Sequence, residues 1–244
     1  MAATRNRTLL VLLWLVVAAL AVLMLMLYVD RAVSSAMRMA PETVVTVFGI
    51  ITLAGYSVIY WGTAAVLFLV YWLRSRRPSP HARHDAWMAE ACAFVFAAVA
   101  GSSLIVGIIK RTVGRARPYM ETPDGGGSFV GFVLDNDLHS FPSGHADTFL
   151  SVAVVLSWLW PRWRWPILIV GVVCAFSRVV LNVHYVSDVL VGGAIGVTVA
   201  HAMRAWFADR GWAFRRRRDG SIRLKPAGRW TLMRVRRRLL RRSA

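Results

Sequence analysis

Long apolar runs dominate this sequence and decide what it can fold into. A helix needs about 20 mostly apolar residues to cross a bilayer. Charged residues make up only 17% of the chain, whereas a soluble domain carries about 25%. The apolar runs are Leu9–Val29, Thr43–Leu73, Ala86–Ile109, Gly144–Trp160, Trp165–Leu181 and Asp188–Phe207. The sequence therefore predicts an all-α polytopic membrane protein with six transmembrane helices.

The first apolar run follows Arg5 and Arg7, as the apolar region of a secretory signal peptide would. It is longer than such a region, and no convincing small-residue cleavage site follows it. We therefore expect it to be a retained anchor. One membrane domain is expected over residues 1–208, followed by a basic tail over residues 209–244.

The distribution of basic residues predicts the orientation in the membrane. If the N-terminus is cytoplasmic, 23 of the 30 Lys and Arg residues fall in cytoplasmic segments, with fifteen of them from Arg204 onward. The positive-inside rule then predicts that both termini are cytoplasmic. Four basic residues nevertheless crowd into Lys110–Arg117 on the opposite side, which indicates a functional role there. The content of Ala, Arg and Trp suggests a bacterium with a GC-rich genome, and hence the inner membrane with this opposite side in the periplasm.

The net charge of +18 also bears on partners. Trp230, Met233 and Leu240 can share one face of a basic amphipathic helix in the tail, and such a helix binds anionic lipid. Nucleic acid is the rival partner, but a tail beside a membrane meets anionic lipid first, so we expect no nucleic acid. The alternative is a solvated tail that only fixes the topology.

Three polar clusters lie at the ends of the apolar runs. The first is Lys110–Pro118, the second is Ser140–His145 and the third is Ser177–Asp188. Because successive membrane helices alternate in direction, all three clusters are predicted to meet on the same non-cytoplasmic side. Ionisable groups at membrane depth are costly and are usually functional. We therefore expect one site built from all three clusters.

The residue types in these clusters suit a phosphate group. Lys110, Arg117 and Arg178 supply three positive charges, and guanidinium groups bind phosphate oxygens in a bidentate way. Ser143 supplies a hydroxyl group, and Gly144 allows close approach of the backbone at the start of a helix. The free N–H groups of a helix N-terminus are themselves a site for anions.

Two histidines complete the chemistry. One of His145 and His184 can attack phosphorus while the other protonates the leaving oxygen. Asp188 follows His184 by four residues, one turn if this segment is helical, and can orient the imidazole as the acid does in a catalytic triad. Phosphoryl transfer depends mostly on positioning and charge stabilisation. The set therefore predicts phosphoryl-transfer chemistry.

The three clusters resemble the type 2 phosphatidic acid phosphatase family, whose site is shared with the vanadium haloperoxidases. The family pattern is Lys-x6-Arg-Pro, then Pro-Ser-Gly-His, then Ser-Arg-x5-His-x3-Asp. The matching segments are Lys110–Pro118, Pro142–His145 and Ser177–Asp188, and no position departs from the pattern. The resemblance covers residues 110–188 by motif and the six-span core by layout.

This resemblance implies a role for each motif residue. His184 is the nucleophile that forms a phosphohistidine, Asp188 supports it, and His145 protonates the leaving alcohol and then activates water. The phosphate is held by Lys110, Arg117, Ser143, Gly144 and Arg178. The resemblance implies no metal and no cofactor.

Other positions carry weaker expectations. Arg111 and Arg115 fall at variable positions of the first motif, where contact with headgroups or solvent is expected. The loop of residues 119–140 is expected to border the substrate headgroup and to influence specificity. Gly192 and Gly196 have the spacing of small residues that allows close helix packing.

The leading hypothesis is a metal-independent lipid phosphate or pyrophosphate phosphatase. Phosphatidic acid, phosphatidylglycerol phosphate, undecaprenyl pyrophosphate and the phosphates of lipid A are all open as substrates. The first alternative is a phosphotransferase that passes the phosphate to another lipid. The second is a non-catalytic transporter or scaffold, although the inverted repeats typical of transporters are not visible in the sequence. The sequence does not indicate an oligomeric state.

Overall fold

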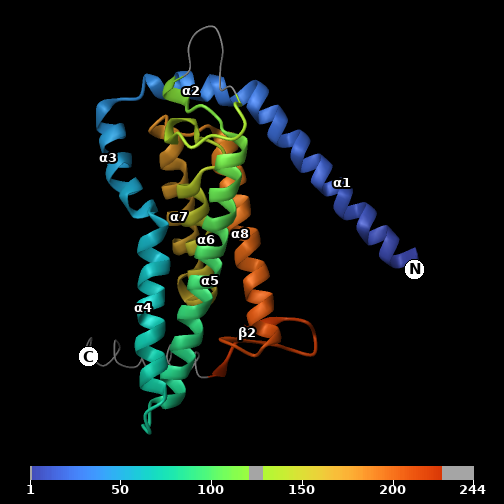
Figure 1. Cartoon of the computed structure of the whole chain (residues 1–244), viewed down its shortest axis with the longest axis vertical. Helices are drawn as coiled ribbons and strands as arrows, with labels where there is room; N and C mark the ends of the chain where they lie inside the picture. Colours follow the sequence, from blue (N-terminus) through green and yellow to red (C-terminus); the bar gives the residue numbers. More distant parts are fainter. Residues whose placement is uncertain (1, 121–128, 227–244) are drawn as a thin grey trace.

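The structure, a computed structural model, describes residues 2–120 and 129–226. It is a bundle of helices that run along the long axis of the molecule (Figure 1). The elements in chain order are α1 (Ala2–Met24), a π-helical turn (Leu25–Val29), α2 (Asp30–Arg38), α3 (Glu42–Thr52), α4 (Ser57–Ser75), α5 (Ala82–Val113), α6 (Gly144–Leu159), α7 (Arg164–Val180), α8 (Val186–Asp209), β1 (Phe214–Arg216) and β2 (Ile222–Leu224). The predicted all-α membrane class is confirmed.

Within the described residues, five helical segments are long and apolar enough to cross a membrane. They are Leu9–Arg38, Glu42–Ser75, Ala82–Val113, Pro161–Val180 and Val186–Asp209. The remaining predicted span is α6, an apolar helix of 16 residues. It is shorter than a bilayer is thick, and half or more of its residues are buried by neighbouring helices. The chain is an integral membrane protein.

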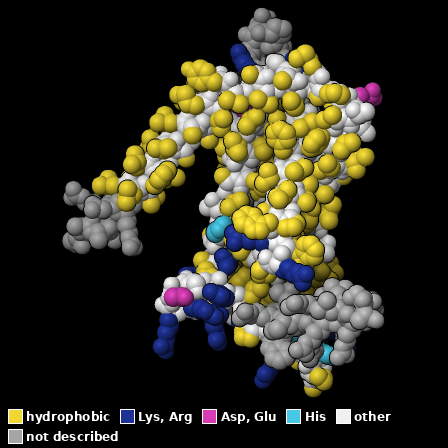
Figure 2. Space-filling view, turned by 180° about the vertical axis from the view of Figure 1, so that it is seen from behind, with side chains coloured by type: hydrophobic (Ala, Val, Ile, Leu, Met, Phe, Trp, Pro, Cys, Tyr) yellow, Lys and Arg dark blue, Asp and Glu magenta, His cyan; other side chains and the backbone are white. Residues whose placement is uncertain are grey.

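In the part of the chain that the structure describes, two apolar clusters hold the bundle together at different depths. The larger cluster joins α5, α6 and α8 and includes Phe94, Val155 and Phe207. The smaller cluster joins α6, α7 and α8 around Phe149 and Val179, and α2 contributes Val33 and Met37 to its edge. Figure 2 shows hydrophobic side chains covering the flank of the bundle and Lys and Arg side chains near one end.

Helix α8 packs closely against the start of α6, as the glycine spacing predicted. A Cβ atom added at Gly192 would lie 2.2 Å from the Ser143 carbonyl oxygen. One added at Gly196 would lie 2.5 Å from the Asp147 carbonyl oxygen. Only glycine permits this approach, which fixes the first turn of α6 against α8.

The second predicted span, Thr43–Leu73, is not one continuous helix. A short 3-10 turn at Leu53–Gly55 separates α3 from α4, and α3 leans away from the bundle in Figure 1. The break brings the chain against α6, because a Cβ atom added at Gly55 would lie 2.2 Å from His145 Cδ2. The break therefore borders the start of α6, where the second motif lies.

The N-terminal segment also differs from a simple span. Helix α1 leans away from the bundle, and α2 crosses the end of the bundle (Figure 1). A π-helical turn at Leu25–Val29 joins the two helices, and turns of this kind are frequent at functional sites. Within the described residues, the apolar side chains of α1 from Leu9 onward are mostly exposed, whereas Asp30 and Ser34 of α2 are buried.

A β-hairpin follows α8 and closes the opposite end of the bundle. Strands β1 and β2 are antiparallel, with Phe214 opposite Leu224. Phe214 is fully buried in the larger apolar cluster, and Glu90 of α5 accepts a hydrogen bond from Ala213 N at 2.7 Å and pairs with Lys225. The start of the predicted tail therefore packs on the bundle. The amphipathic segment with Trp230, Met233 and Leu240 lies outside the described residues.

Candidate active site

The three motif clusters meet at the end of the bundle opposite the hairpin (Figure 1). Lys110 lies in the last turn of α5 and Arg178 in the last turn of α7. Gly144 and His145 begin α6, and Asp188 lies in the first turn of α8. Antiparallel packing of these helices brings residues distant in the sequence to one end.

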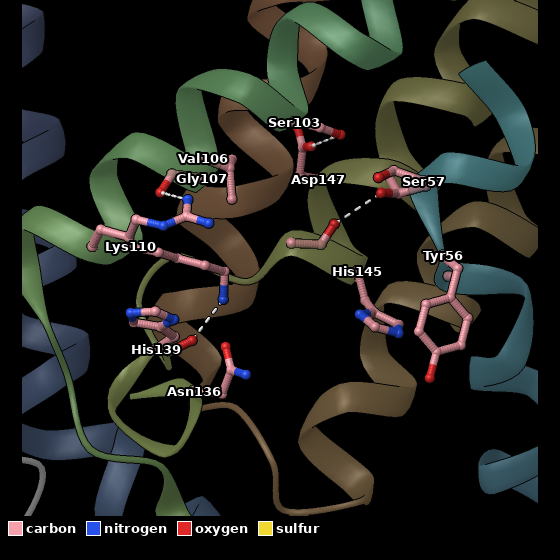
Figure 3. Close-up of a pocket in the computed structure, with 14 residues that line it drawn as sticks. Tyr56, Ser57, Ser103, Val106, Gly107, Lys110, Asn136, His139, His145 and Asp147 are labelled. Atoms are coloured by element: carbon pink, nitrogen blue, oxygen red, sulfur yellow. Dashed lines mark hydrogen bonds between the residues drawn. The ribbon is translucent and has the colours of Figure 1, made fainter. Parts of the chain in front are cut away.

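A pocket of about 280 Å³ opens at this end. In Figure 3 the side chains of Lys110 and His145 extend into it from α5 and α6, and Tyr56 stands beside the imidazole. Further lining residues come from the α3–α4 break, from α5 and α6 and from the loop before α6: Gly55, Ser57, Ser103, Val106, Gly107, Arg111, Asn136, His139, Gly144, Asp147 and Thr148. His184, Arg117 and Arg178 do not line this pocket among the described residues, so it represents the side of the site next to His145.

The first motif is tied to the loop before α6. Lys110 Nζ donates a hydrogen bond to the His139 carbonyl at 2.6 Å, and Arg117 Nε donates to the Asn136 carbonyl at 3.1 Å. An ammonium group has three N–H donors and a guanidinium group has five. Both cations therefore keep donors for a phosphate group after they have positioned the loop.

Arg178 is held by the second apolar span, which the motifs did not predict. Its Nη1 donates a hydrogen bond to Thr52 Oγ1 at 2.6 Å, at the end of α3. The side chain is buried, and its Nε has no hydrogen-bond partner among the described groups. Buried donors are normally paired, so this N–H is available to an anion.

The start of α6 links the second motif to the third. Ser143 caps the helix, its Oγ accepting from Ala146 N at 3.4 Å, and its own N–H donates to the Asp188 carbonyl at 3.0 Å. At Gly144 an added Cβ atom would lie 3.6 Å from Lys110 Cε. These contacts place the N-terminus of α6 directly beside a cation, as an anion site requires.

His145 lies in the field of the three cations. Its ring meets Tyr56 edge-on, with the ring centroids 5.2 Å apart. Arg178, Lys110 and Arg117 all act electrostatically on its imidazole, Arg178 most strongly. Within the described residues, the structure therefore brings the predicted acid together with all three predicted phosphate-binding cations.

His184 lies in the turn between α7 and α8 and is almost completely buried. Its Nδ1 is 3.7 Å from Asp188 Oδ2, which is longer than a hydrogen bond. Burial lowers the pKa of His184 to about 3, and Lys110 and Arg178 act in the same direction, while Asp188 opposes them. The imidazole is therefore unprotonated at neutral pH, the state that a nucleophile needs. Catalytic hydrogen bonds are often long in free enzymes and shorten when substrate binds.

Asp188 is fully buried and held by several donors. Its Oδ1 accepts from Arg115 Nη1 at 2.6 Å. Its Oδ2 accepts from Ser140 Oγ at 2.5 Å and from Tyr185 N at 2.9 Å, the latter as part of the cap of α8. The carboxylate next to His184 is therefore fixed by groups from the first motif, the second motif and its own helix.

The expectation that Arg115 contacts headgroups or solvent was wrong. Its side chain is 4% exposed and bridges two buried carboxylates, those of Asp188 and Asp30, with Nη2 2.9 Å from Asp30 Oδ2. Its guanidinium also lies over the Tyr185 ring. Burial opposes its charge, but Asp188 and Asp30 outweigh this effect and raise the pKa of Arg115. Arg111, by contrast, is exposed, and its Nη1 donates to the Gly107 carbonyl of its own helix.

Asp30 was not predicted as a site residue. The available signal was an acidic residue directly after a long apolar run, because carboxylates at membrane depth are costly. Its contacts depend on the position of α2, which no local pattern specifies. Another acidic residue, Asp147, lines the pocket, and its Oδ2 accepts from Ser103 Oγ at 3.4 Å. In the described parts of the chain, no three His, Cys, Asp or Glu side chains are grouped so as to hold a metal ion.

Comparison with known proteins defines the class. The PAP2 superfamily matches residues 90–212, about half of the chain, and this range contains all eight predicted site residues. The polytopic membrane fold and the PAP2 match indicate the same class of protein. The chain belongs to the PAP2 superfamily, the type 2 phosphatidic acid phosphatases.

Curated relatives include two kinds of lipid phosphatase. A lipid A 1-phosphatase of Rhizobium johnstonii is 32% identical over 148 residues, which cover 61% of this chain and 59% of the relative. A decaprenylphosphoryl-5-phosphoribose phosphatase of Mycobacterium tuberculosis is 35% identical over 140 residues, covering 57% of this chain and 71% of the relative. The aligned part of the chain thus spans about 60% of the length of the lipid A 1-phosphatase.

A solved structure shares the fold. The first transmembrane PAP2 type phosphatidylglycerolphosphate phosphatase from Bacillus subtilis superposes with a TM-score of 0.57 at 21% identity. The superposition covers 82% of this chain and 96% of that chain. Aquifex aeolicus LpxE gives a TM-score of 0.52 at 19% identity, covering 72% and 93%. At these identities the likeness concerns the fold alone.

Proposed function

We propose that this protein is a lipid phosphate or pyrophosphate phosphatase that uses His184 as its nucleophile. The observation that carries the proposal is that three cations lie at one end of an apolar bundle together with two histidines. His145 lies beside the cations, and His184 is buried and unprotonated. Phosphoryl transfer needs a positioned nucleophile and stabilisation of charge on the phosphate oxygens. Lys110, Arg117 and Arg178 supply that charge.

The proposed reaction has two steps. His184 attacks phosphorus while the bond from phosphorus to the leaving oxygen breaks. The negative charge of the bound phosphate offsets the three cations, so His145 carries a proton in the complex and gives it to the leaving oxygen. The product is a phosphohistidine and a free alcohol, or a lipid phosphate when the substrate is a pyrophosphate. His145 then takes a proton from water, whose oxygen attacks phosphorus while the bond from phosphorus to the His184 nitrogen breaks, which releases inorganic phosphate and the free imidazole. Asp188 stabilises the positive charge that develops on the His184 imidazole.

The substrate is proposed to be a lipid, because the pocket lies at the end of an apolar bundle that is exposed to the bilayer. The names of the relatives and of the structural neighbour refer to lipid A, decaprenylphosphoryl-5-phosphoribose, undecaprenyl diphosphate and phosphatidylglycerol phosphate. Phosphatidic acid belongs in the same set. Asn136 and His139 border the pocket, in support of a role for the loop of residues 119–140 in specificity; residues 121–128 lie outside the described residues.

The orientation is proposed from charge. Among the described residues beyond α1, seven basic residues belong to the site end: Arg31, Arg38, Lys110, Arg111, Arg115, Arg117 and Arg178. The hairpin end carries fourteen: Arg74, Arg76, Arg77, Arg83, Arg162, Arg164, Arg204, Arg210, Arg215, Arg216, Arg217, Arg218, Arg223 and Lys225. By the positive-inside rule the hairpin end faces the cytoplasm. The site would then open on the periplasmic side of a bacterial inner membrane, with the basic tail on anionic lipid.

The test is phosphate release by the purified protein in detergent, with a panel of the candidate lipids and with EDTA present. We expect release from at least one lipid that is not reduced by the chelator. Labelled phosphate that appears on an acceptor lipid, with none released, would instead identify a phosphotransferase. If a folded protein neither releases nor transfers phosphate on any lipid of the panel, the proposed activity is wrong.

A further inference from the structure

The reacting histidine is connected to a carboxylate of the N-terminal segment through one arginine. Asp30, at the start of α2, is 1% exposed. It accepts hydrogen bonds from Arg115 Nη2 at 2.9 Å, from Ser187 N at 3.0 Å and from the Ser187 hydroxyl. Arg115 uses its other terminal nitrogen to reach Asp188 Oδ1 at 2.6 Å. One guanidinium is therefore shared by two carboxylates.

Helix α2 holds Asp30 in place through contacts with the loops of two motifs. Ser34 Oγ donates to Asn182 Oδ1 at 2.9 Å, two residues before His184. Arg38 Nη2 donates to the carbonyl of Pro118, next to Arg117, at 2.7 Å. Val33 and Met37 pack on the apolar cluster beneath the site. These contacts fix the position of α2, and α2 in turn fixes the buried carboxylate of Asp30.

The charges in this cluster have a consequence for His184. Asp30 and Asp188 carry two negative charges and Arg115 carries one positive charge, so the cluster keeps one net negative charge beside the imidazole. If Asp30 were neutral, Arg115 would be paired with Asp188 alone and that net charge would vanish. In a buried site little solvent screens a fixed charge, so its loss strongly weakens the electrostatic stabilisation of the positive charge that develops on His184.

We propose that Asp30 is a positioning residue for the reaction, acting through Arg115 so that Asp188 keeps its charge available to His184. The inference rests on the proposed function. Within the described residues, Asp30 makes no hydrogen bond or ion pair with Lys110, Arg117 or Arg178; its partners are Arg115 and Ser187. Its effect therefore falls on the chemical step and not on the binding of the phosphate group.

The first test is Asp30→Asn, which removes the charge and keeps the size of the side chain. On a lipid that the wild type hydrolyses, we expect kcat to fall about tenfold or more, as for loss of one charge-assisted interaction, with KM unchanged. The single-turnover rate should fall by the same factor. The matched control is Asp85→Asn, which neutralises another buried carboxylate, paired with Arg74 at 3.3 Å near the hairpin end. It should leave kcat unchanged.

The second test separates charge from structure. The double variant Asp30→Asn with Arg115→Gln restores one net negative charge, because Asp188 remains and keeps Ser140 and Tyr185 N as donors. We expect its kcat to exceed that of Asp30→Asn alone. A purely structural role predicts the reverse, since two parts of a buried network are then broken.

Three results would overturn the proposal: an unchanged kcat in Asp30→Asn, an effect confined to KM, or a double variant slower than the single one. If Asp30→Asn does not fold because its amide faces the Arg115 donors, Asp30→Ser removes the same charge without that amide and is judged by the same criteria. An inactive wild type would count against the proposed function itself, whereas an active wild type with an unaffected Asp30→Asn counts only against this inference.

Discussion

Replacing His184 with alanine is expected to lower phosphate release by about 10⁴-fold or more, since loss of a covalent nucleophile removes the reaction path itself. The buried imidazole is unprotonated, so the substitution removes no ion pair and the bundle should still fold. The measurement is the initial rate of phosphate release from the lipid that the wild type hydrolyses fastest. The size-exclusion profiles of both proteins in detergent show whether the variant is folded.

The matched control is His201→Ala. His201 is an exposed histidine in α8 near the hairpin end, where its ring meets Trp158, and its loss should leave the rate unchanged. If the folded His184→Ala variant keeps more than about a tenth of the wild-type rate, His184 is not the nucleophile.

Replacing Arg178 with methionine is expected to lower kcat/KM by about 10²–10³-fold, the effect of removing one preorganised donor to a developing negative charge. The side chain is buried and positioned by Thr52, and its Nε has no hydrogen-bond partner in the described part of the chain. Methionine keeps an apolar side chain of similar length at the end of α7. The comparison uses the same lipid and reads kcat and KM separately.

Arg162→Met serves as control for the loss of an arginine near a helix end. Arg162 is exposed in the short turn before α7, at the end of that helix remote from Arg178, and its removal should leave kcat/KM unchanged. Equal rates for Arg178→Met and wild type would show that Arg178 does not hold the phosphate.

The sequence allowed the helical membrane class and the meeting of the three motifs to be predicted because both depend on short-range patterns. Apolar runs define spans, and alternating helix direction brings the end of α5 and the starts of α6 and α8 together. The close approach of α8 at Gly192 was also predictable, because small residues spaced one turn apart permit such packing.

The parts that the sequence did not predict depend on contacts between distant segments. Arg115 looks like any basic residue near a membrane surface until α2 places Asp30 beside it, 85 positions away in the chain. Thr52 becomes part of the site only because the second span breaks at Leu53–Gly55. The hairpin likewise depends on Phe214 entering a core formed by other helices.

The covalent intermediate gives the most direct test of the central claim that His184 is the nucleophile of a phosphatase. His145→Ala removes the group proposed to activate water, so the second step should be slow. A labelled aryl phosphate suits this test because its leaving group departs without a proton. The label is in the phosphate group. The proposed mechanism predicts a burst of aryl alcohol and an alkali-stable phosphate label on His184, and it predicts no label in the double variant His145→Ala with His184→Ala. Release of the aryl alcohol with no label on the protein, or with label on another residue, would contradict it.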